Sequence, residues 1–178
     1  AVVVVAILER FPNRDYHYGG IQRRDGKARA PEEWTYTAIP RLAELVRKME
    51  NKPELPFWLI GHSAGGQFVG RLSAFQRTGA VRHVAANPGS QLVPTRDLPF
   101  GYGFGELPEE LADDERLRFY LSQPLTIYLG TLDNKPDAYF ATNPTAMKQG
   151  GGRLQRGRYC YEQAKKLAAE KGWPFNWR

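Results

Sequence analysis

The feature that most constrains the fold of this chain is the stretch 56–76, where a short apolar run passes through a glycine-flanked serine into a second apolar pattern. Four large apolar residues between Pro56 and Gly61 predict a short buried strand, and the apolar spacing after the serine is helical. Ser63 lies in the turn, and Gly61 and Gly65 complete the Gly-x-Ser-x-Gly spacing of a nucleophile elbow. Glycine is expected at both places because a Cβ there would meet the opposite arm of the turn. The sequence therefore predicts an exposed nucleophile at Ser63, rather than an idle serine in a glycine-rich turn.

The rest of the chain alternates between strand-type apolar runs and helical patterns. Strands are predicted at 1–8, 57–60, 81–86 and 125–130, helices at 31–49, 108–121 and 159–171, and a further extended segment at 175–178. Such alternation predicts an α/β fold, with a mostly parallel β-sheet flanked by helices on both faces. The length of 178 residues suits a single domain.

Proline and glycine predict how the connecting segments are built. Pro31, with two acids after it, is expected to open the first helix, and Pro40 to kink that helix or divide it. Gly101, Gly103 and Gly105 alternate with aromatic residues in a loop at 91–106. No strand runs into this loop and no glycine-led helix follows, so it predicts a mobile or aromatic-lined loop and not a dinucleotide site.

Composition and charge exclude several classes of function. The net charge of +6 is spread along the chain without a nucleic-acid-binding motif, which favours a solvated basic surface over a nucleic-acid partner. No apolar run reaches the ~20 residues that span a bilayer, so we expect a soluble protein. Cys160 is alone and reads as an ordinary helix residue, and no histidine, cysteine or carboxylate spacing indicates a metal. No cofactor is expected.

A serine nucleophile needs a base, usually a histidine oriented by a carboxylate. In proteins with the elbow the order along the chain is Ser, then Asp or Glu, then His. Asp133 fits the second place because it follows the 125–130 strand at the same sheet edge as Ser63, and Asp137 is the fallback. All three histidines come earlier in the chain: His17, His62 and His83. His62 is expected to point away from the nucleophile and His83 to be packed in a strand, which leaves His17, in a loop at the correct edge, as the candidate base within the chain.

Several stretches together resemble bacterial α/β-hydrolase-fold esterases of the depolymerase and lipase type. They are Phe57 to Gly66 with Phe68-Val69-x-Arg71-Leu72, Asn87 to Ser90, Pro99 to Phe104, and Leu129-Gly130-Thr131-Leu132-Asp133. The resemblance implies that Ser63 is the nucleophile, that Asp133 is the triad acid, and that the backbone N–H of Ala64 is one oxyanion donor.

The same resemblance implies an incomplete α/β-hydrolase domain over residues 1–178. In that family the His-Gly stretch that gives the second oxyanion donor precedes the strand seen here at Ala1, and the catalytic histidine follows the strand that would start near Trp177. The chain also opens directly inside a predicted strand. We therefore expect a fragment truncated at both ends, without its true N-terminus, whose catalytic histidine is missing and which is inactive by itself.

The expected function is hydrolysis of carboxylic esters, small or polymeric, through an acyl-enzyme on Ser63. Thioesterases, amidases and peptidases of the same fold share this machinery and remain alternatives. A different alternative is a catalytically inactive binding module of the hydrolase fold, which the absence of a histidine after Asp133 would also fit.

Overall fold

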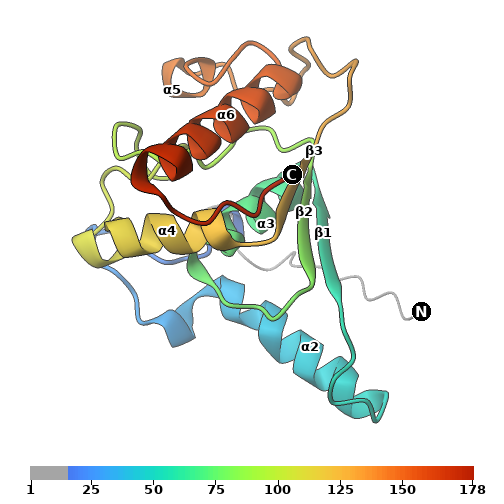
Figure 1. Cartoon of the computed structure of the whole chain (residues 1–178). Helices are drawn as coiled ribbons and strands as arrows, with labels where there is room; N and C mark the ends of the chain where they lie inside the picture. The colour runs from blue at the N-terminus through green and yellow to red at the C-terminus, as the bar shows by residue number, and fades with distance from the viewer. Residues whose placement is uncertain (1–15) are drawn as a thin grey trace.

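The computed structural model describes residues 16–178, so the strand expected at 1–8 lies outside the described residues. The elements follow one another in the alternating order that the sequence predicts (Figure 1). They are the short 3₁₀ turns η1 (Pro31–Glu33), η2 (Thr35–Thr37) and η3 (Glu109–Leu111), the helices α2 (Ala38–Met49), α3 (Ala64–Phe75), α4 (Asp114–Ser122), α5 (Pro144–Met147) and α6 (Arg153–Lys171), and the strands β1 (Trp58–His62), β2 (Arg82–Ala86) and β3 (Leu125–Tyr128).

The three strands form one parallel sheet in the order β1-β2-β3. Trp58 pairs with Arg82 and His62 with Ala86, while β3 pairs with β2 from His83–Leu125 to Ala86–Tyr128. The extended segment expected at 175–178 runs beside β3: the Arg178 N–H donates to the Leu125 carbonyl, and the Arg178 carbonyl accepts from the Ile127 N–H, both at 2.9 Å. One residue bonding to positions two apart on its neighbour is the pattern of a parallel pair. The prediction of a parallel α/β sheet is confirmed.

Helix α3 packs across the sheet, and α4 and α6 lie on the same side of it, to the left of the strands in Figure 1. The core is built on the inner face of α3, where Leu72 is fully buried and the ring of Phe75 packs against Phe104 at 5.7 Å between centroids. Tyr120 of α4 continues this aromatic core toward Trp177, at 4.6 Å. The long connections are thereby fastened to the helix that carries the elbow.

The other face of the sheet has little cover among residues 16–178. Trp58, Ile60 and Tyr128 are 60%, 66% and 61% exposed, and the pairing register places all three on the face opposite α3. The expectation that the strand after Pro56 is buried is therefore wrong for one of its faces. A continuous apolar run is typical of a strand that is covered on both faces. The described residues cover only the face of this sheet that packs against α3.

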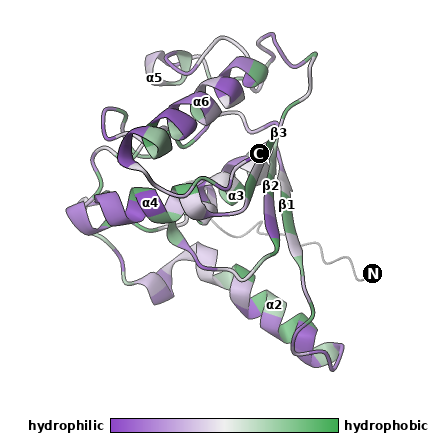
Figure 2. Cartoon of the chain, in the orientation of Figure 1, coloured by the Kyte–Doolittle hydropathy of each residue, from purple (hydrophilic) through white to green (hydrophobic). Residues whose placement is uncertain are grey.

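Helix α2 begins later than its sequence pattern suggests. Pro31 opens only the 3₁₀ turn η1, and a second turn, η2, follows before α2 starts at Ala38. Pro40 causes no break inside the helix because it lies in the first turn, where a backbone N–H has no partner in any case. Figure 2 shows apolar and polar residues alternating along α2, as in an amphipathic helix.

Helix α6 begins six residues earlier than expected, at Arg153 instead of Tyr159. Its first turns carry Arg153 and Arg156, both buried, which a search for apolar spacing passes over. The 91–106 loop is as aromatic-lined as predicted, since Phe100, Tyr102 and Phe104 all pack into or against the core. No helix within residues 16–178 has the length and apolar character needed to cross a membrane.

Candidate active site

Ser63 joins the end of β1 to the start of α3 in a strained backbone conformation, with φ 52° and ψ −113°. A positive φ is uncommon for a residue with a side chain, and the surrounding structure must hold it in place. The Ser63 N–H donates to the Ala86 carbonyl at the end of β2, at 2.9 Å, and the Ser63 carbonyl accepts from Gln67 inside α3. The side chain is exposed. The turn therefore presents the hydroxyl to solvent at the carboxyl edge of the sheet.

The steric argument for the flanking glycines holds at Gly61 and not at Gly65. A Cβ on Gly61 would collide with the backbone carbonyl of Gly65. A Cβ on Gly65 would meet only the Tyr16 hydroxyl at 3.7 Å, which is ordinary contact. The second tight position is Gly66, where a Cβ would lie 2.7 Å from the Ala86 carbonyl oxygen. Gly61 lets the two arms of the turn close on each other, and Gly66 lets α3 lie directly on β2.

Ala64 is the first residue of α3. The N–H groups in the first turn of a helix have no acceptor within it, and they carry the positive end of the helix dipole. The Ala64 N–H therefore belongs to a group of donors that an anion beside Ser63 could use. Its role as an oxyanion donor stays a prediction.

Asp133 lies beyond the end of β3, in a turn closed by a hydrogen bond from its own N–H to the Gly130 carbonyl at 3.1 Å. Helix α6 fixes this residue twice. The Leu154 N–H donates to the Asp133 carbonyl at 3.0 Å, and the Arg153 guanidinium reaches the Asp133 Oδ1 at 3.1 Å. Since β1 and β3 are separated by one strand, their ends lie about 10 Å apart at the usual strand spacing. Ser63 and Asp133 thus share one edge of the sheet, as predicted.

Asp137 is engaged more completely than Asp133. Its Oδ2 and Oδ1 accept from two Arg153 nitrogens at 2.6 and 3.0 Å, and Oδ1 also accepts from the Tyr139 N–H at 2.8 Å. These hydrogen bonds, that of Arg153 above all, lower the pKa of Asp137. Asp133 accepts from Arg153 through Oδ1 alone, and among residues 16–178 its Oδ2 has no hydrogen-bond partner.

None of the three histidine side chains hydrogen-bonds to Ser63 or Asp133 within the described part of the chain. His62 lies on the exposed face of β1 with Trp58 and Ile60. His83 is packed in β2 as predicted, 1% exposed, with its Nε2 2.7 Å from the Thr78 hydroxyl. Burial, and secondarily the charge of Arg82, lowers the pKa of His83 to about 4. Cys160 is fully buried in α6 and burial raises the pKa of its thiol, so it is an ordinary helix residue as expected.

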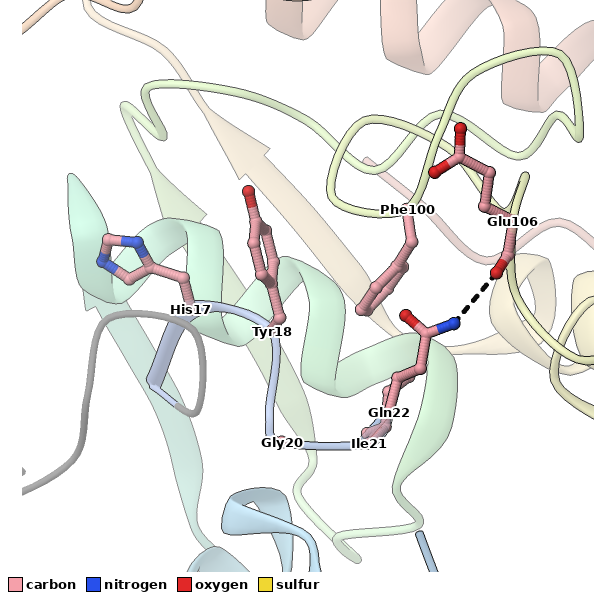
Figure 3. A pocket seen from close by; sticks show the side chains of 7 residues that line it. All are labelled: His17, Tyr18, Gly20, Ile21, Gln22, Phe100 and Glu106. Atoms are coloured by element: carbon pink, nitrogen blue, oxygen red, sulfur yellow. Dashed lines mark hydrogen bonds between the residues drawn. The ribbon is translucent and has the colours of Figure 1, made fainter. Parts of the chain in front are cut away.

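His17 lines a cavity of about 400 Å³ between two loops. Figure 3 shows one wall formed by the segment from His17 to Gln22 and the other by Phe100 and Glu106. The Gln22 side chain donates to the Glu106 carbonyl at 2.9 Å and joins the two walls. The rings of Tyr18 and Phe100 pack at 5.5 Å between centroids. Burial and the nearby Arg71 lower the pKa of His17, which favours the neutral form of its imidazole.

Arg71 of α3 holds both walls of this cavity in place. Its guanidinium is 2% exposed and donates to the Gly101 carbonyl at 2.7 Å, to the His17 carbonyl at 3.4 Å and to the Ser90 hydroxyl at 2.9 Å. It also lies 4.9 Å from the centre of the Tyr18 ring. The cavity walls are therefore tied to the helix that begins at the elbow, although they come from segments about 80 residues apart.

Two residues at this edge were not singled out as site residues from the sequence. The sequence treats Arg153 as one more surface charge, and it gives Asn87 no role beyond ending a strand and opening one of the stretches that carry the resemblance. A signal for Asn87 does exist, because asparagine tolerates the left-handed backbone conformation that a chain needs to turn sharply off a strand. Within residues 16–178 no cluster of three histidine, cysteine or acidic side chains is placed to hold a metal.

Comparison with known proteins identifies two solved structures that are similar to this chain. No protein-family model and no curated protein sequence matches the chain. Among solved structures, poly(aspartic acid) hydrolase-1 from Sphingomonas sp. KT-1 superimposes with a TM-score of 0.85 at 35% sequence identity over 94% of this chain. LpqC, a poly(3-hydroxybutyrate) depolymerase from Bordetella parapertussis, superimposes with a TM-score of 0.84 at 32% identity, also over 94%.

The chain spans 63% of the length of the first structure and 56% of the second. Both structures are named as enzymes that hydrolyse a polymer. The motifs around Ser63 and Asp133 resemble those of proteins of this type. With its parallel sheet, this chain therefore has part of the α/β-hydrolase fold and is similar to bacterial hydrolases of the esterase and depolymerase type.

Proposed function

We propose that this chain carries the nucleophile, the acid and one oxyanion donor of a serine hydrolase that cleaves carboxylic esters. The observation that carries the proposal is Ser63 itself, an exposed residue with a strained backbone at the junction of β1 and α3. Strain of this kind costs about 1–3 kcal/mol, and strained residues cluster at active sites. Here it lifts one hydroxyl above the edge of the sheet at the start of a helix, where a substrate carbonyl can approach.

The reaction follows the acyl-enzyme scheme. Ser63 Oγ gives its proton to a base and attacks the ester carbonyl, and the Ala64 N–H at the start of α3 donates to the oxyanion that forms. Collapse of this intermediate expels the alcohol, which takes the proton back from the base. Water then attacks the acyl-enzyme in the same way and releases the acid.

Asp133 is proposed as the acid that orients the base. The free Oδ2 of Asp133 leaves one carboxylate oxygen for an imidazole, whereas both oxygens of Asp137 are already bonded to Arg153. The anchoring by Arg153 and Leu154 would keep this carboxylate from rotating away. Asp137 is then a brace for Arg153 and not a member of the triad.

The base is proposed to come from sequence outside these 178 residues. The three histidines present are a packed side chain (His83), one on the exposed face of β1 (His62), and His17, whose imidazole lines the cavity and has no hydrogen bond to Ser63. His17, whose pKa is lowered by burial and by Arg71, remains the alternative base within the chain. By this proposal the 178 residues alone are an incomplete catalyst.

The substrate is proposed to be polymeric or a small ester analogue of a polymer. The names of the two similar structures describe hydrolysis of poly(aspartic acid) and of poly(3-hydroxybutyrate), an amide-linked and an ester-linked chain. The cavity between the segment from His17 to Gln22 and the loop of Phe100 and Glu106 is lined by aromatic and polar side chains, which would suit a segment of such a chain. Amidase and thioesterase activities would use the same residues, so amide and thioester substrates remain alternatives to the ester.

A binding module without catalysis is the second candidate, favoured by the lack of any histidine bonded to Ser63 or Asp133 among residues 16–178. Such a protein would bind a polymer in the cavity and leave it intact.

The two candidates are separated by turnover of p-nitrophenyl butyrate by the protein with its native flanking sequence. We expect hydrolysis that Ser63→Ala abolishes and that Asp133→Asn lowers by orders of magnitude, as about 10⁴-fold in a well-studied serine protease. Asp137→Asn is the matched control and should change kcat little. A large loss with Asp137→Asn and none with Asp133→Asn would show that the wrong carboxylate has been chosen, and binding of polymer without any turnover would favour the module.

A further inference from the structure

We infer that Asn87 is a positioning residue that sets the place of the acid relative to the nucleophile, an inference that rests on the function proposed above. Asn87 follows β2, the strand between the one that carries Ser63 and the one that leads to Asp133. Its backbone has φ 41°, in the left-handed region that few residues with side chains adopt. The chain therefore turns sharply off the sheet at this residue.

The peptide group between Ala86 and Asn87 links the elbow to β3. Its carbonyl accepts from the Ser63 N–H, and its N–H donates to the Tyr128 carbonyl, each at 2.9 Å. Both bonds belong to the main chain, so any residue at position 87 could make them.

The side chain of Asn87 adds a link that only this kind of residue can make. Its Oδ1 accepts from the Gly130 N–H at 2.7 Å, and the Gly130 carbonyl accepts from the Asp133 N–H at 3.1 Å. Three hydrogen bonds thus run in series from Ser63 to Asp133, and the Asn87 side chain supplies the one that crosses from the end of β2 to the acid turn. Asn87 and Gly130 are both half-buried, which limits competition from water.

The other hydrogen bonds to Asp133 do not connect it to the end of β2. Arg153 and Leu154 fasten Asp133 to α6, which packs on α4 and not on the elbow strand. Without the Asn87 bond, the turn would still be attached to α6 and, through the main chain, to the end of β3, but it would lose its direct hydrogen bond to the residue that follows β2. A misplacement of about 1 Å can cost about 10²-fold in rate, so this bond is expected to act on turnover more than on substrate binding.

The test uses the protein with its native flanking sequence and p-nitrophenyl butyrate. Asn87→Gly removes the side-chain oxygen and keeps a backbone suited to φ 41°, while Asn87→Asp keeps an acceptor for the Gly130 N–H. We expect Asn87→Gly to lower kcat by about 10- to 100-fold with KM almost unchanged, and Asn87→Asp to retain most of the activity. Asn87→Ser, whose hydroxyl is too short to reach Gly130, provides a second variant with the same expected loss.

A double-mutant cycle with Asp133→Asn separates positioning from a general loss of structure. If Asn87 acts through Asp133, Asn87→Gly should cost almost nothing further once Asp133→Asn is present, because groups that act as a unit are not additive. An equal loss in both backgrounds, or an unchanged kcat in Asn87→Gly, would overturn the inference alone. If Asp133→Asn leaves turnover intact, the acid assignment fails and this inference falls with it.

Discussion

At the scale of single residues, the site depends on two residues whose backbone conformations are held by their surroundings. Ser63 and Asn87 both have positive φ, and each is held by hydrogen bonds to a neighbouring strand or turn. The tight turn at Ser63 could be predicted, because the Gly-x-Ser-x-Gly motif between a strand and a helix is a local pattern of the sequence. The bond of Asn87 to Gly130 joins residues 43 apart, and nothing local in the sequence reports it.

His83 is a residue whose burial has a measurable consequence for stability. Its pKa is about 4 in the folded protein, against 6.5 for an ordinary histidine. As pH falls from about 6.5 toward 4, the unfolded chain therefore takes up a proton that the folded protein does not, and the free energy of unfolding decreases by up to about 3 kcal/mol.

This effect is tested by urea unfolding at about pH 7 and about pH 5, above the range where most carboxylates titrate. His83→Gln cannot take up the proton and can still bond to Thr78, so its free energy of unfolding should fall less between the two pH values than that of the wild type. His62→Gln, on an exposed position, is the control and should follow the wild type. Parallel pH dependence of wild type and His83→Gln would contradict the buried, neutral state of His83.

At the scale of elements, the elbow depends on how closely α3 approaches β2. Gly66 is the contact point, since a Cβ there would lie 2.7 Å from the Ala86 carbonyl oxygen, an atom of the backbone that cannot move aside by rotating. Gly66→Ala should therefore push α3 off the sheet and lower the free energy of unfolding by about 1–3 kcal/mol, as overpacking does.

Gly65→Ala is the matched control for this prediction. It lies in the same helix turn, faces only the Tyr16 hydroxyl at 3.7 Å, and replaces glycine by a better helix former. We expect its thermal unfolding midpoint to equal or exceed that of the wild type, while that of Gly66→Ala falls. The reverse order would show that the glycine of the Gly-x-Ser-x-Gly motif, and not its neighbour, sets the helix-to-strand distance.

The order of the elements could be predicted from the sequence because strand and helix periodicities are local patterns. The parallel sheet, the helix after Ser63 and the extended segment that ends at Arg178 all follow from such patterns. The start of α6 could not, because its first turns are anchored by buried arginines. Arg156 is fully buried, donates to the Gly89 and Ala141 carbonyls, and lies 3.7 Å from the centre of the Phe140 ring. Periodicity counts apolar residues and treats such side chains as surface.

At the scale of the whole molecule, long-range contacts build what periodicity cannot show. The cavity lined by His17 has walls from two distant loops, both tied to α3 by Arg71, a buried cation whose hydrogen bonds go to carbonyls and neutral side chains. Trp58, Ile60 and Tyr128 lie exposed on the opposite face of the sheet. Their apolar side chains predict a strand, but whether the face of that strand is covered depends on elements far away in the sequence.

The central claim is that Ser63 is the nucleophile, and the most direct measurement is covalent labelling by a fluorophosphonate probe, mapped by peptide mass spectrometry, in the protein with its native flanking sequence. We predict one adduct, on Ser63, that is lost in Ser63→Ala and retained in the control Ser122→Ala. Asp133→Asn should slow the labelling, because the base that activates the serine would lose its orientation. Labelling of Ser73, Ser90 or Ser122 in place of Ser63, or no labelling of a protein that still hydrolyses p-nitrophenyl butyrate, would contradict the claim.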